Sequence, residues 1–227
     1  MALPIKVYTH ASGPNPAKVI MILKELSLPY TPILVASSDV KSPPFTLINP
    51  NGRLPAIEDP NTGITLWESG AIIEYLIETY DDKDHTISFE RGSEEYFHAK
   101  QFLHFQMSGQ GPYFGQAVWF LFYHAEKIAS AQERYLNEIR RVTGVLEGIL
   151  GGGEEGEKKK EYLVGGRFSY VDAAFVPWFE VVPVVTDSID LAKDFPNVKA
   201  WLDRVQGRKA IAESIREWEE ARAAEKK

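Results

Sequence analysis

Two short segments in the first third of the chain constrain its fold more than any other feature. The run from Gly52 to Ile57 places Pro55 at the entrance of a short apolar strand. The run from Trp67 to Ile72 places an acid and a hydroxyl at the start of a helix with apolar periodicity. Together the two runs predict a backbone clamp and an anion-binding helix start within one small fold.

The residues around these segments alternate between strand and helix patterns. Asn15 as N-cap and Pro16 at the first helical position open one helix, which ends before Pro29. A turn at 60–63 joins two short strands, and a second helix follows at 69–80. Strand patterns cover residues 5–8, 30–35, 56–58 and 65–67. The order is β-α-β followed by β-β-α, which is the thioredoxin-like arrangement of an α/β domain.

The remainder of the chain reads as helix. An acidic linker at 81–84 precedes it, and a loop of glycine and charged residues lies at 151–160. The expected helices cover residues 92–107, 113–124, 129–150, 169–185, 196–205 and 208–224. We therefore expect a thioredoxin-like domain over residues 1–82 and an all-helical domain over residues 89–227.

Composition narrows the class of protein. The chain has 227 residues and a formal net charge of −7, which argues against nucleic acid or an anionic membrane as the main partner. It has no cysteine, which excludes disulfides, a protein thiolate and cysteine metal sites. The five histidines show no metal spacing, and no run approaches the roughly 18 apolar residues of a membrane span. The composition favours a soluble, cytoplasmic protein without a metal.

Glu68 and Ser69 favour a ligand site. A helix N-terminus offers free N–H groups and the positive end of its dipole to a carboxylate, while Glu68 can accept from an ammonium group. Ser69 as an ordinary N-cap, and Pro55 as an ordinary edge-strand proline, are the structural alternatives. A cis Leu54–Pro55 bond would leave the N–H and C=O of Leu54 for a ligand backbone. The combination suits a peptide with a free α-amino and α-carboxyl group, and glutathione is such a peptide.

Asn15 and Ser12 are candidate donors to the glutathione sulfur. Both lie where the first strand leads into the first helix. A free thiol has a pKa of about 8.5, so an amide or hydroxyl donor and a helix dipole would favour the thiolate. As alternatives, Asn15 caps the helix and Ser12 stabilises the turn. Tyr8 is a third candidate donor, although its strand position favours burial.

Two basic residues are candidates for the rest of the ligand. Lys41 lies in a polar, proline-bearing loop and would hold the carboxylate at the glycine end of glutathione. Exposure to solvent is the alternative for this lysine. Arg53 either binds the ligand, supports its own loop or contributes to a subunit interface.

The helical part holds a dense aromatic stretch. Most of these rings are expected in the core, but Gly109, Gly111, Pro112 and Gly115 interrupt the stretch and would let some rings line an apolar cleft. The candidate pocket residues for a hydrophobic co-substrate are Met107, Tyr113, Phe114, Trp119 and Tyr123.

These motifs resemble the cytosolic glutathione transferases over the whole chain. The resemblance rests on Leu54–Pro55, on Glu68–Ser69 and on a capping box from Ser169 to Asp172. Further runs are similar to the branch that contains the yeast nitrogen-catabolite regulator and the bacterial nu-class enzymes. These runs are Ser12 to Asn15, Asn49 to Arg53, Gln106 to Gly109, Gly115 to Ala117, His124 to Ala131 and Glu133 to Tyr135.

The resemblance implies a homodimer with one glutathione site per subunit. It places Asn15 near the sulfur, Leu54 against the cysteinyl backbone, Glu68 and Ser69 on the γ-glutamyl head, and Lys41 near the glycine end. The chain lacks the Asn/Gln-rich N-terminal extension of the nitrogen regulator and the cysteine of omega-like relatives. The regulator's prion-like behaviour and a protein mixed-disulfide mechanism are therefore not expected.

Three functions remain open at this stage. The first is a glutathione S-transferase that activates the thiol for attack on a small hydrophobic electrophile. The second is a glutathione-dependent peroxidase or disulfide reductase, or a specialised secondary-metabolite enzyme of a fungal pathway, because none of these needs a protein cysteine. The third is a glutathione-binding or regulatory protein without turnover. Glutathione is the expected co-substrate in the enzymatic cases.

Overall fold

The described part of the chain forms two compact units. The computed structural model describes residues 2–11, 13–152 and 158–225. The first unit combines the residues up to 90 with those from 208 onward, and the second unit comprises residues 91–207. The expected extents of the two domains, 1–82 and 89–227, remain predictions, and the last helix packs with the first unit.

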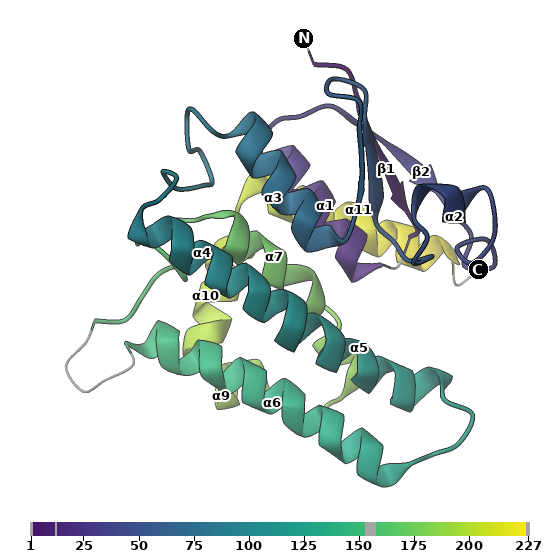
Figure 1. The fold of residues 1–227 in the computed structure, drawn as a ribbon. Coiled ribbons are helices and arrows are strands. Elements are labelled where there is room, and N and C mark those ends of the chain that lie inside the picture. Colours follow the sequence, from purple (N-terminus) through teal and green to yellow (C-terminus); the bar gives the residue numbers. More distant parts are fainter. Residues whose placement is uncertain (1, 12, 153–157, 226–227) are drawn as a thin grey trace. The chain divides into compact units, whose positions relative to one another are not determined.

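The first unit is built on a four-stranded mixed sheet (Figure 1). Its order is β2-β1-β3-β4, with β1 parallel to β2 and antiparallel to β3, and β4 antiparallel to β3. The strands are β1 (Ile5–Thr9), β2 (Tyr30–Leu34), β3 (Ala56–Asp59) and β4 (Ile64–Trp67). The helices are α1 (Pro14–Glu25), α2 (Phe45–Ile48), α3 (Ser69–Tyr80) and α11 (Lys209–Glu225). The thioredoxin-like order expected from the sequence is confirmed.

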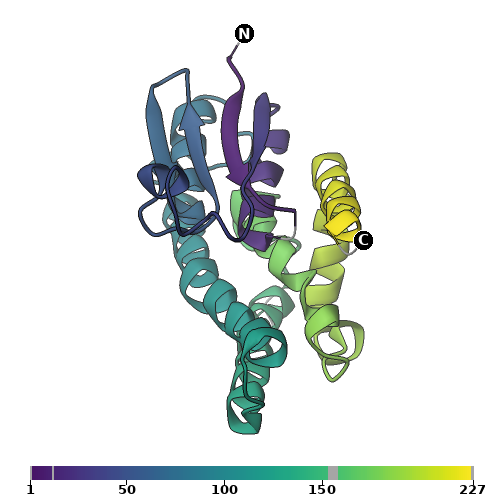
Figure 2. The same cartoon turned by 90° about the vertical axis from the view of Figure 1, so that its right-hand side faces the viewer.

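Apolar periodicity explains how this unit packs. Alternate residues of β1 are buried, and Val7 pairs with the buried Ile57 of β3. The buried faces of α1 and α3 pack against each other, and both helices contact strands of the sheet. Figure 2 shows the same strands and helices after a quarter turn. The core of the unit therefore lies between the sheet and these two helices.

The starts of α1 and α3 differ from the sequence-based expectation. The N-cap of α1 is Gly13, and the helix begins at Pro14, so Asn15 lies in the first turn and is not the cap. Proline at the first helical position is favoured because its missing N–H has no helical partner there. The residue at the N-cap position of α3 is Glu68, and Ser69 is the first helical residue. Asn15 and Ser69 thus lie inside the first turn of their helices, and Glu68 lies directly before α3.

The second unit is all-helical, as expected. Its helices are α4 (Glu94–Phe105), the π-helical η1 (Gln106–Gln110), α5 (Gly111–Val118), the π-helical η2 (Trp119–Tyr123), α6 (Ala129–Gly151), α7 (Tyr170–Phe179), α8 (Val182–Val185), α9 (Leu191–Asp194) and α10 (Pro196–Gln206). The single helix expected at 169–185 is divided into α7 and α8. Pro183 explains the break, because proline lacks the N–H that would continue the helical ladder.

Asp172 organises the centre of this unit. The capping box expected from Ser169 to Asp172 is present, and every residue of α7 is buried. The Asp172 carboxylate accepts from the Ser169 N–H at 2.9 Å, the Ser169 hydroxyl at 3.0 Å, the Leu163 N–H at 3.0 Å and the Trp201 indole at 2.8 Å. Burial raises the pKa of Asp172, and these donors oppose that rise. One side chain thus joins α7, α10 and the preceding loop.

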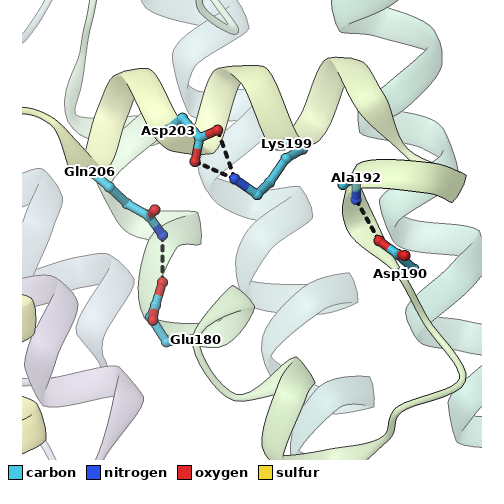
Figure 3. Close-up of polar contacts among 6 residues, drawn as sticks. All are labelled: Glu180, Asp190, Ala192, Lys199, Asp203 and Gln206. Atoms are coloured by element: carbon cyan, nitrogen blue, oxygen red, sulfur yellow. Dashed lines mark hydrogen bonds and ion pairs between the residues drawn. The ribbon is translucent and has the colours of Figure 1, made fainter.

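Figure 3 shows further polar contacts of this unit. Asp190 caps α9 by accepting from the Ala192 N–H at 3.0 Å. Lys199 pairs with Asp203 one turn later on α10 at 2.6 Å. The Gln206 amide donates to Glu180, which follows α7. Across the residues that the structure describes, every helix is too short or too polar to cross a membrane.

Candidate functional site

The loop from Asn49 to Arg53 is closed by the buried side chain of Asn49. Its amide nitrogen donates to the Arg53 carbonyl at 2.6 Å, and its oxygen accepts from the Asn51 N–H at 2.9 Å. The Gly52 N–H donates to the Asn49 carbonyl at 2.9 Å. Because three backbone groups are held by one residue, the loop presents the segment that follows it in a fixed orientation.

Gly52 is required by the backbone of this loop. Its φ is +58°, and a Cβ atom at this position would lie 2.5 Å from the Val40 carbonyl oxygen. Only glycine avoids both the left-handed strain and the collision. Gly52 therefore lets the loop from Asn49 to Arg53, the Asn49 loop, lie directly against the loop that contains Val40 and Lys41, the Lys41 loop.

We expect Gly52→Ala to lower the free energy of unfolding by about 1–3 kcal/mol and to weaken glutathione binding, because the loop must move. Thermal unfolding and calorimetric titration with glutathione measure the two effects. Gly63→Ala is the matched control, since Gly63 also has positive φ, +77°, but open space around its Cβ position. Equal losses of glutathione affinity in the two variants would contradict the role given to the close approach.

Leu54 follows this loop with both backbone groups unoccupied. The Leu54–Pro55 peptide bond is cis, and Pro55 is buried directly before β3. Within the described residues, neither the N–H nor the C=O of Leu54 makes a hydrogen bond. The half-buried Leu54 therefore offers one donor and one acceptor at the end of the sheet, as an extended peptide backbone requires.

The start of α3 supplies polar groups beside the same loop. Glu68 has φ of +70°, an unfavourable conformation for a residue with a side chain, and its carboxylate is exposed. Ser69 is 3% exposed and begins the helix. The first-turn N–H groups of α3 point out of the helix, so its N-terminus can receive a carboxylate.

Lys41 and Asn51 connect the loop to Glu68. The Lys41 ammonium donates to the Asn51 carbonyl at 2.9 Å, and the Asn51 amide donates to the Glu68 carboxylate at 3.4 Å. The structure thereby brings Lys41 and Glu68 together through one residue. Arg53 lies in the same loop with an exposed side chain, and its backbone carbonyl accepts from the Asn49 amide. Lys41 and Glu68 thus place opposite charges on either side of Asn51.

The β1–α1 junction carries the candidate sulfur donors. Asn15 is half-buried in the first turn of α1, where the helix dipole is positive. Ser12 lies outside the described residues. The Tyr8 hydroxyl donates to Glu58 at 2.6 Å, and burial, this hydrogen bond and the Glu58 charge raise the pKa of Tyr8 to about 12. Because Glu58 holds the Tyr8 proton, Tyr8 is the weaker candidate, and the role of Asn15 as a sulfur donor stays a prediction.

Lys18 is a buried charge-bearing residue that the sequence did not single out. It lies in α1 with no exposed surface. Burial lowers its pKa to about 7, and the charge of Glu68 acts in the opposite direction. Lys18 therefore contributes a nearby electrostatic partner for Glu68 from the inside of the unit.

Lys18→Met should flatten the pH dependence of stability. Between about pH 7 and 10 the unfolded chain holds a proton on Lys18 that the folded chain has released, so this group makes the wild-type free energy of unfolding rise with pH. Urea unfolding at several pH values in this window measures the slope. Lys193→Met, at an exposed lysine of α9, is the control. An unchanged slope in Lys18→Met would refute the assignment.

The expected co-substrate residues do not share one environment. Phe114 is 1% exposed and packs edge-on against Phe179, so it belongs to the core of the helical unit. Trp119 and Tyr123 are exposed and stack at 6.2 Å in η2. Tyr113 lies against Tyr135, and Met107 is half-buried in η1. A pocket formed by these residues remains a prediction.

Two contributors were missed by the sequence-based assignment. Asn51 belongs to the recognisable run from Asn49 to Arg53, so its position in that run was the available signal. Lys18 interrupts the apolar stretch from Ala17 to Leu23, which marked it as unusual. Neither the burial of Lys18 nor the proximity of Lys18 to Glu68 follows from the sequence spacing, since both depend on how α1 packs on α3.

Comparison with known protein families and with known proteins points to a single family. Residues 7–84 match the family described as glutathione S-transferase, N-terminal domain, and residues 111–209 match glutathione S-transferase, C-terminal domain. The glutathione S-transferase-like protein tpcF of Aspergillus fumigatus is 51% identical over 215 residues, which cover 93% of this chain and 95% of that protein. Glutathione S-transferase 2 of Schizosaccharomyces pombe is 40% identical, with 95% and 96% covered.

Solved structures agree with these matches. The glutathione transferase URE2P8 of Phanerochaete chrysosporium, determined with oxidized glutathione, has a TM-score of 0.89 and 38% identity over 98% of this chain and 97% of that one. Ure2p in complex with glutathione has a TM-score of 0.86 and 33% identity, with 94% and 99% covered. The chain therefore belongs to the glutathione S-transferase family, in its Ure2p-like fungal branch.

Proposed function

We propose that this protein is a glutathione S-transferase that activates the thiol of glutathione for attack on a small hydrophobic electrophile. The observation that carries the proposal is the set of linked polar groups in the loop directly before Leu54. Its free backbone pair lies after the closed loop from Asn49 to Arg53, in which Lys41 holds the Asn51 carbonyl and the Asn51 amide reaches the Glu68 carboxylate beside the start of α3. Such an arrangement suits a peptide with charged groups at both ends.

Each group then has one task in binding. Leu54 pairs with the cysteinyl backbone, and Pro55 holds that segment at the sheet end. Glu68 accepts from the α-ammonium group of the γ-glutamyl head, and Ser69 with the α3 N-terminus receives its carboxylate. Lys41 attracts the carboxylate of the glycine end. Arg53 is assigned to supporting the loop, because its carbonyl is the group that Asn49 holds.

Asn15 performs the chemical task. Its amide and the positive end of the α1 dipole stabilise the thiolate of bound glutathione, which lowers the thiol pKa from about 8.5 toward neutrality. The thiolate then adds to the electrophile, or attacks a peroxide or disulfide. Two solved relatives from Phanerochaete chrysosporium were determined with oxidized glutathione, which supports reduction of peroxides or disulfides as the second candidate activity.

Calorimetric titration with glutathione tests the binding part, and assays with an aryl halide and a hydroperoxide on the same sample test turnover. Binding with either turnover supports an enzyme. Binding without turnover favours a pathway-specific enzyme or a regulatory protein. Absence of glutathione binding would overturn the proposal. The homodimer and a cytoplasmic location are carried forward as predictions, and analytical ultracentrifugation tests the first.

Ser69→Ala should weaken glutathione binding about tenfold, because the γ-glutamyl carboxylate loses a hydroxyl donor, while turnover at saturating glutathione changes little. Titration and steady-state kinetics separate the two effects. Ser93→Ala is a matched control, since Ser93 caps α4 by accepting from the Tyr96 N–H at 3.1 Å in the other unit. The assignment of Ser69 fails if both variants bind glutathione as the wild type does.

A further inference from the structure

Lys18 lies in the buried face of α1, where the neighbours that follow it are apolar. Met21 and Ile22 share its side of the helix one turn later, and both are completely buried. Asn15 lies three residues earlier on the same side of α1. Lys18 itself has no exposed surface. This face of α1 therefore runs from the candidate thiol site through a cationic side chain into the core.

The burial of Lys18 opposes the stability of the fold. An ammonium group loses its hydration when it is buried, and burial lowers the pKa of Lys18 to about 7. A methionine has nearly the same length and would fill the position without this desolvation. Ionisable groups with strongly shifted pKa values cluster at functional sites. Packing alone therefore does not explain a lysine at this position.

Glu68 supplies the negative charge that acts on Lys18. Its charge opposes the lowering of the Lys18 pKa, so the carboxylate and the ammonium group attract each other. The two groups differ in their surroundings, because the Glu68 side chain is exposed whereas Lys18 is enclosed. The attraction on Glu68 thus comes from the protein interior, and a ligand approaches Glu68 from the solvent side.

The conformation of Glu68 depends on such contacts. Its φ of +70° is unfavourable for a residue with a side chain. The Glu68 carbonyl accepts from the Ile72 N–H at 2.9 Å, which fixes the backbone to α3. At the carboxylate, the hydrogen bond from the Asn51 amide is long, 3.4 Å. An exposed glutamate samples several rotamers, so an attraction from a fixed, buried cation reduces the ordering that a ligand must supply.

We propose that Lys18 is a positioning residue that holds the Glu68 carboxylate in place for the α-ammonium group of the γ-glutamyl head. The inference rests on the proposed function, because it takes glutathione as the ligand of this site. Lys18 acts through Glu68 and not by contact with the peptide. The γ-glutamyl head carries one positive and one negative charge, so direct attraction and repulsion by Lys18 largely cancel, and the effect through Glu68 remains.

Lys18→Met separates positioning from packing. At about pH 6, where Lys18 is mostly protonated, the variant should bind glutathione about three- to tenfold more weakly. The midpoint of its urea unfolding at the same pH should equal or exceed that of the wild type. Because Glu68 is exposed, the loss of Lys18 leaves no buried charge without a partner. Calorimetric titration with glutathione and urea unfolding measure the two quantities.

Lys24→Met is the matched control for the loss of a lysine from α1. Lys24 is also largely buried, with 15% of its side chain exposed, but it pairs with Glu217 of α11 at 2.7 Å. We expect this variant to bind glutathione as the wild type does. Equal losses of glutathione affinity in Lys18→Met and Lys24→Met would overturn the proposal.

A double-mutant cycle with Glu68→Gln tests the route of the effect. Glutamine has no charge for Lys18 to attract, so adding Lys18→Met to Glu68→Gln should cause little further loss of glutathione affinity. Losses that simply add would show that Lys18 acts independently of Glu68, which contradicts the proposal.

The outcomes distinguish this proposal from the proposed function. If the wild type fails to bind glutathione, the proposed function is wrong and this inference falls with it. If the wild type binds glutathione and Lys18→Met binds it equally well, the proposed function stands and the positioning role is wrong. A Lys18→Met protein that unfolds at a lower urea concentration, or that does not fold by circular dichroism, assigns Lys18 to structure and also overturns the proposal.

Discussion

Asp172→Ala should lower the free energy of unfolding by roughly 3–5 kcal/mol, the largest stability effect we expect from one substitution. The variant leaves the Trp201 indole and the Leu163 and Ser169 N–H groups without their acceptor in a fully buried environment. Each unsatisfied buried donor costs about 1–3 kcal/mol. Urea unfolding followed by circular dichroism measures the change.

Asp190→Ala is the matched control for this prediction. Asp190 also accepts from the first N–H groups of a helix, but it is exposed and caps only α9. Its loss should cost about 1 kcal/mol, because water replaces the carboxylate. If Asp172→Ala costs no more than Asp190→Ala, the buried network does not have the importance that its hydrogen bonds indicate.

Asn15→Ala should lower kcat for conjugation about 10–100-fold, whereas the affinity for glutathione changes much less. The amide is assigned to the thiolate, which exists only after the proton has left, and binding of the peptide itself is assigned to other residues. Steady-state kinetics with glutathione varied at a fixed aryl halide concentration separate kcat from KM.

Asn15→Asp tests whether the Asn15 amide acts by donating a hydrogen bond to the thiolate. The carboxylate has the same shape as the amide, but it donates no hydrogen bond and repels a thiolate, so turnover should fall at least as far as in Asn15→Ala. Unchanged turnover in both variants would remove Asn15 from the mechanism. Ser12 would then become the leading donor, because the Tyr8 proton is held by Glu58.

The strands and helices of the first unit were predictable because local patterns specify them. Alternation in β1, the apolar face of α1 and the proline before β3 all indicate the observed elements. The helix starts were less predictable. The sequence predicts Asn15 as the N-cap and Pro16 as the first helical residue, but Pro14 suits the first position equally well, and the helix begins there, two residues earlier.

The residues of the candidate site could be predicted from the sequence only where its groups are close along the chain. The pairs Leu54–Pro55 and Glu68–Ser69 carry their own signals. The positive φ of Glu68 has no sequence signal, because such a conformation is expected of glycine. The hydrogen bond from Asn51 to Glu68 joins residues 17 positions apart, and it depends on the packing of the Asn49 loop against the start of α3.

The position of the last helix illustrates the same limit. Residues 208–224 have a helical pattern, but a pattern does not say which surface a helix covers. In the structure α11 packs on α1 of the first unit. Long-range packing of this kind is decided by shape complementarity of whole faces, so it appears only in three dimensions.

The central claim is that the first unit binds glutathione and favours its thiolate. A pH titration of the ultraviolet thiolate absorption of glutathione bound to the wild-type protein tests it most directly. We predict that the bound thiol titrates well below the pKa of about 8.5 of a free thiol, and that the shift is smaller in Asn15→Ala. A bound thiol that titrates like free glutathione would contradict the claim, even if the peptide binds tightly.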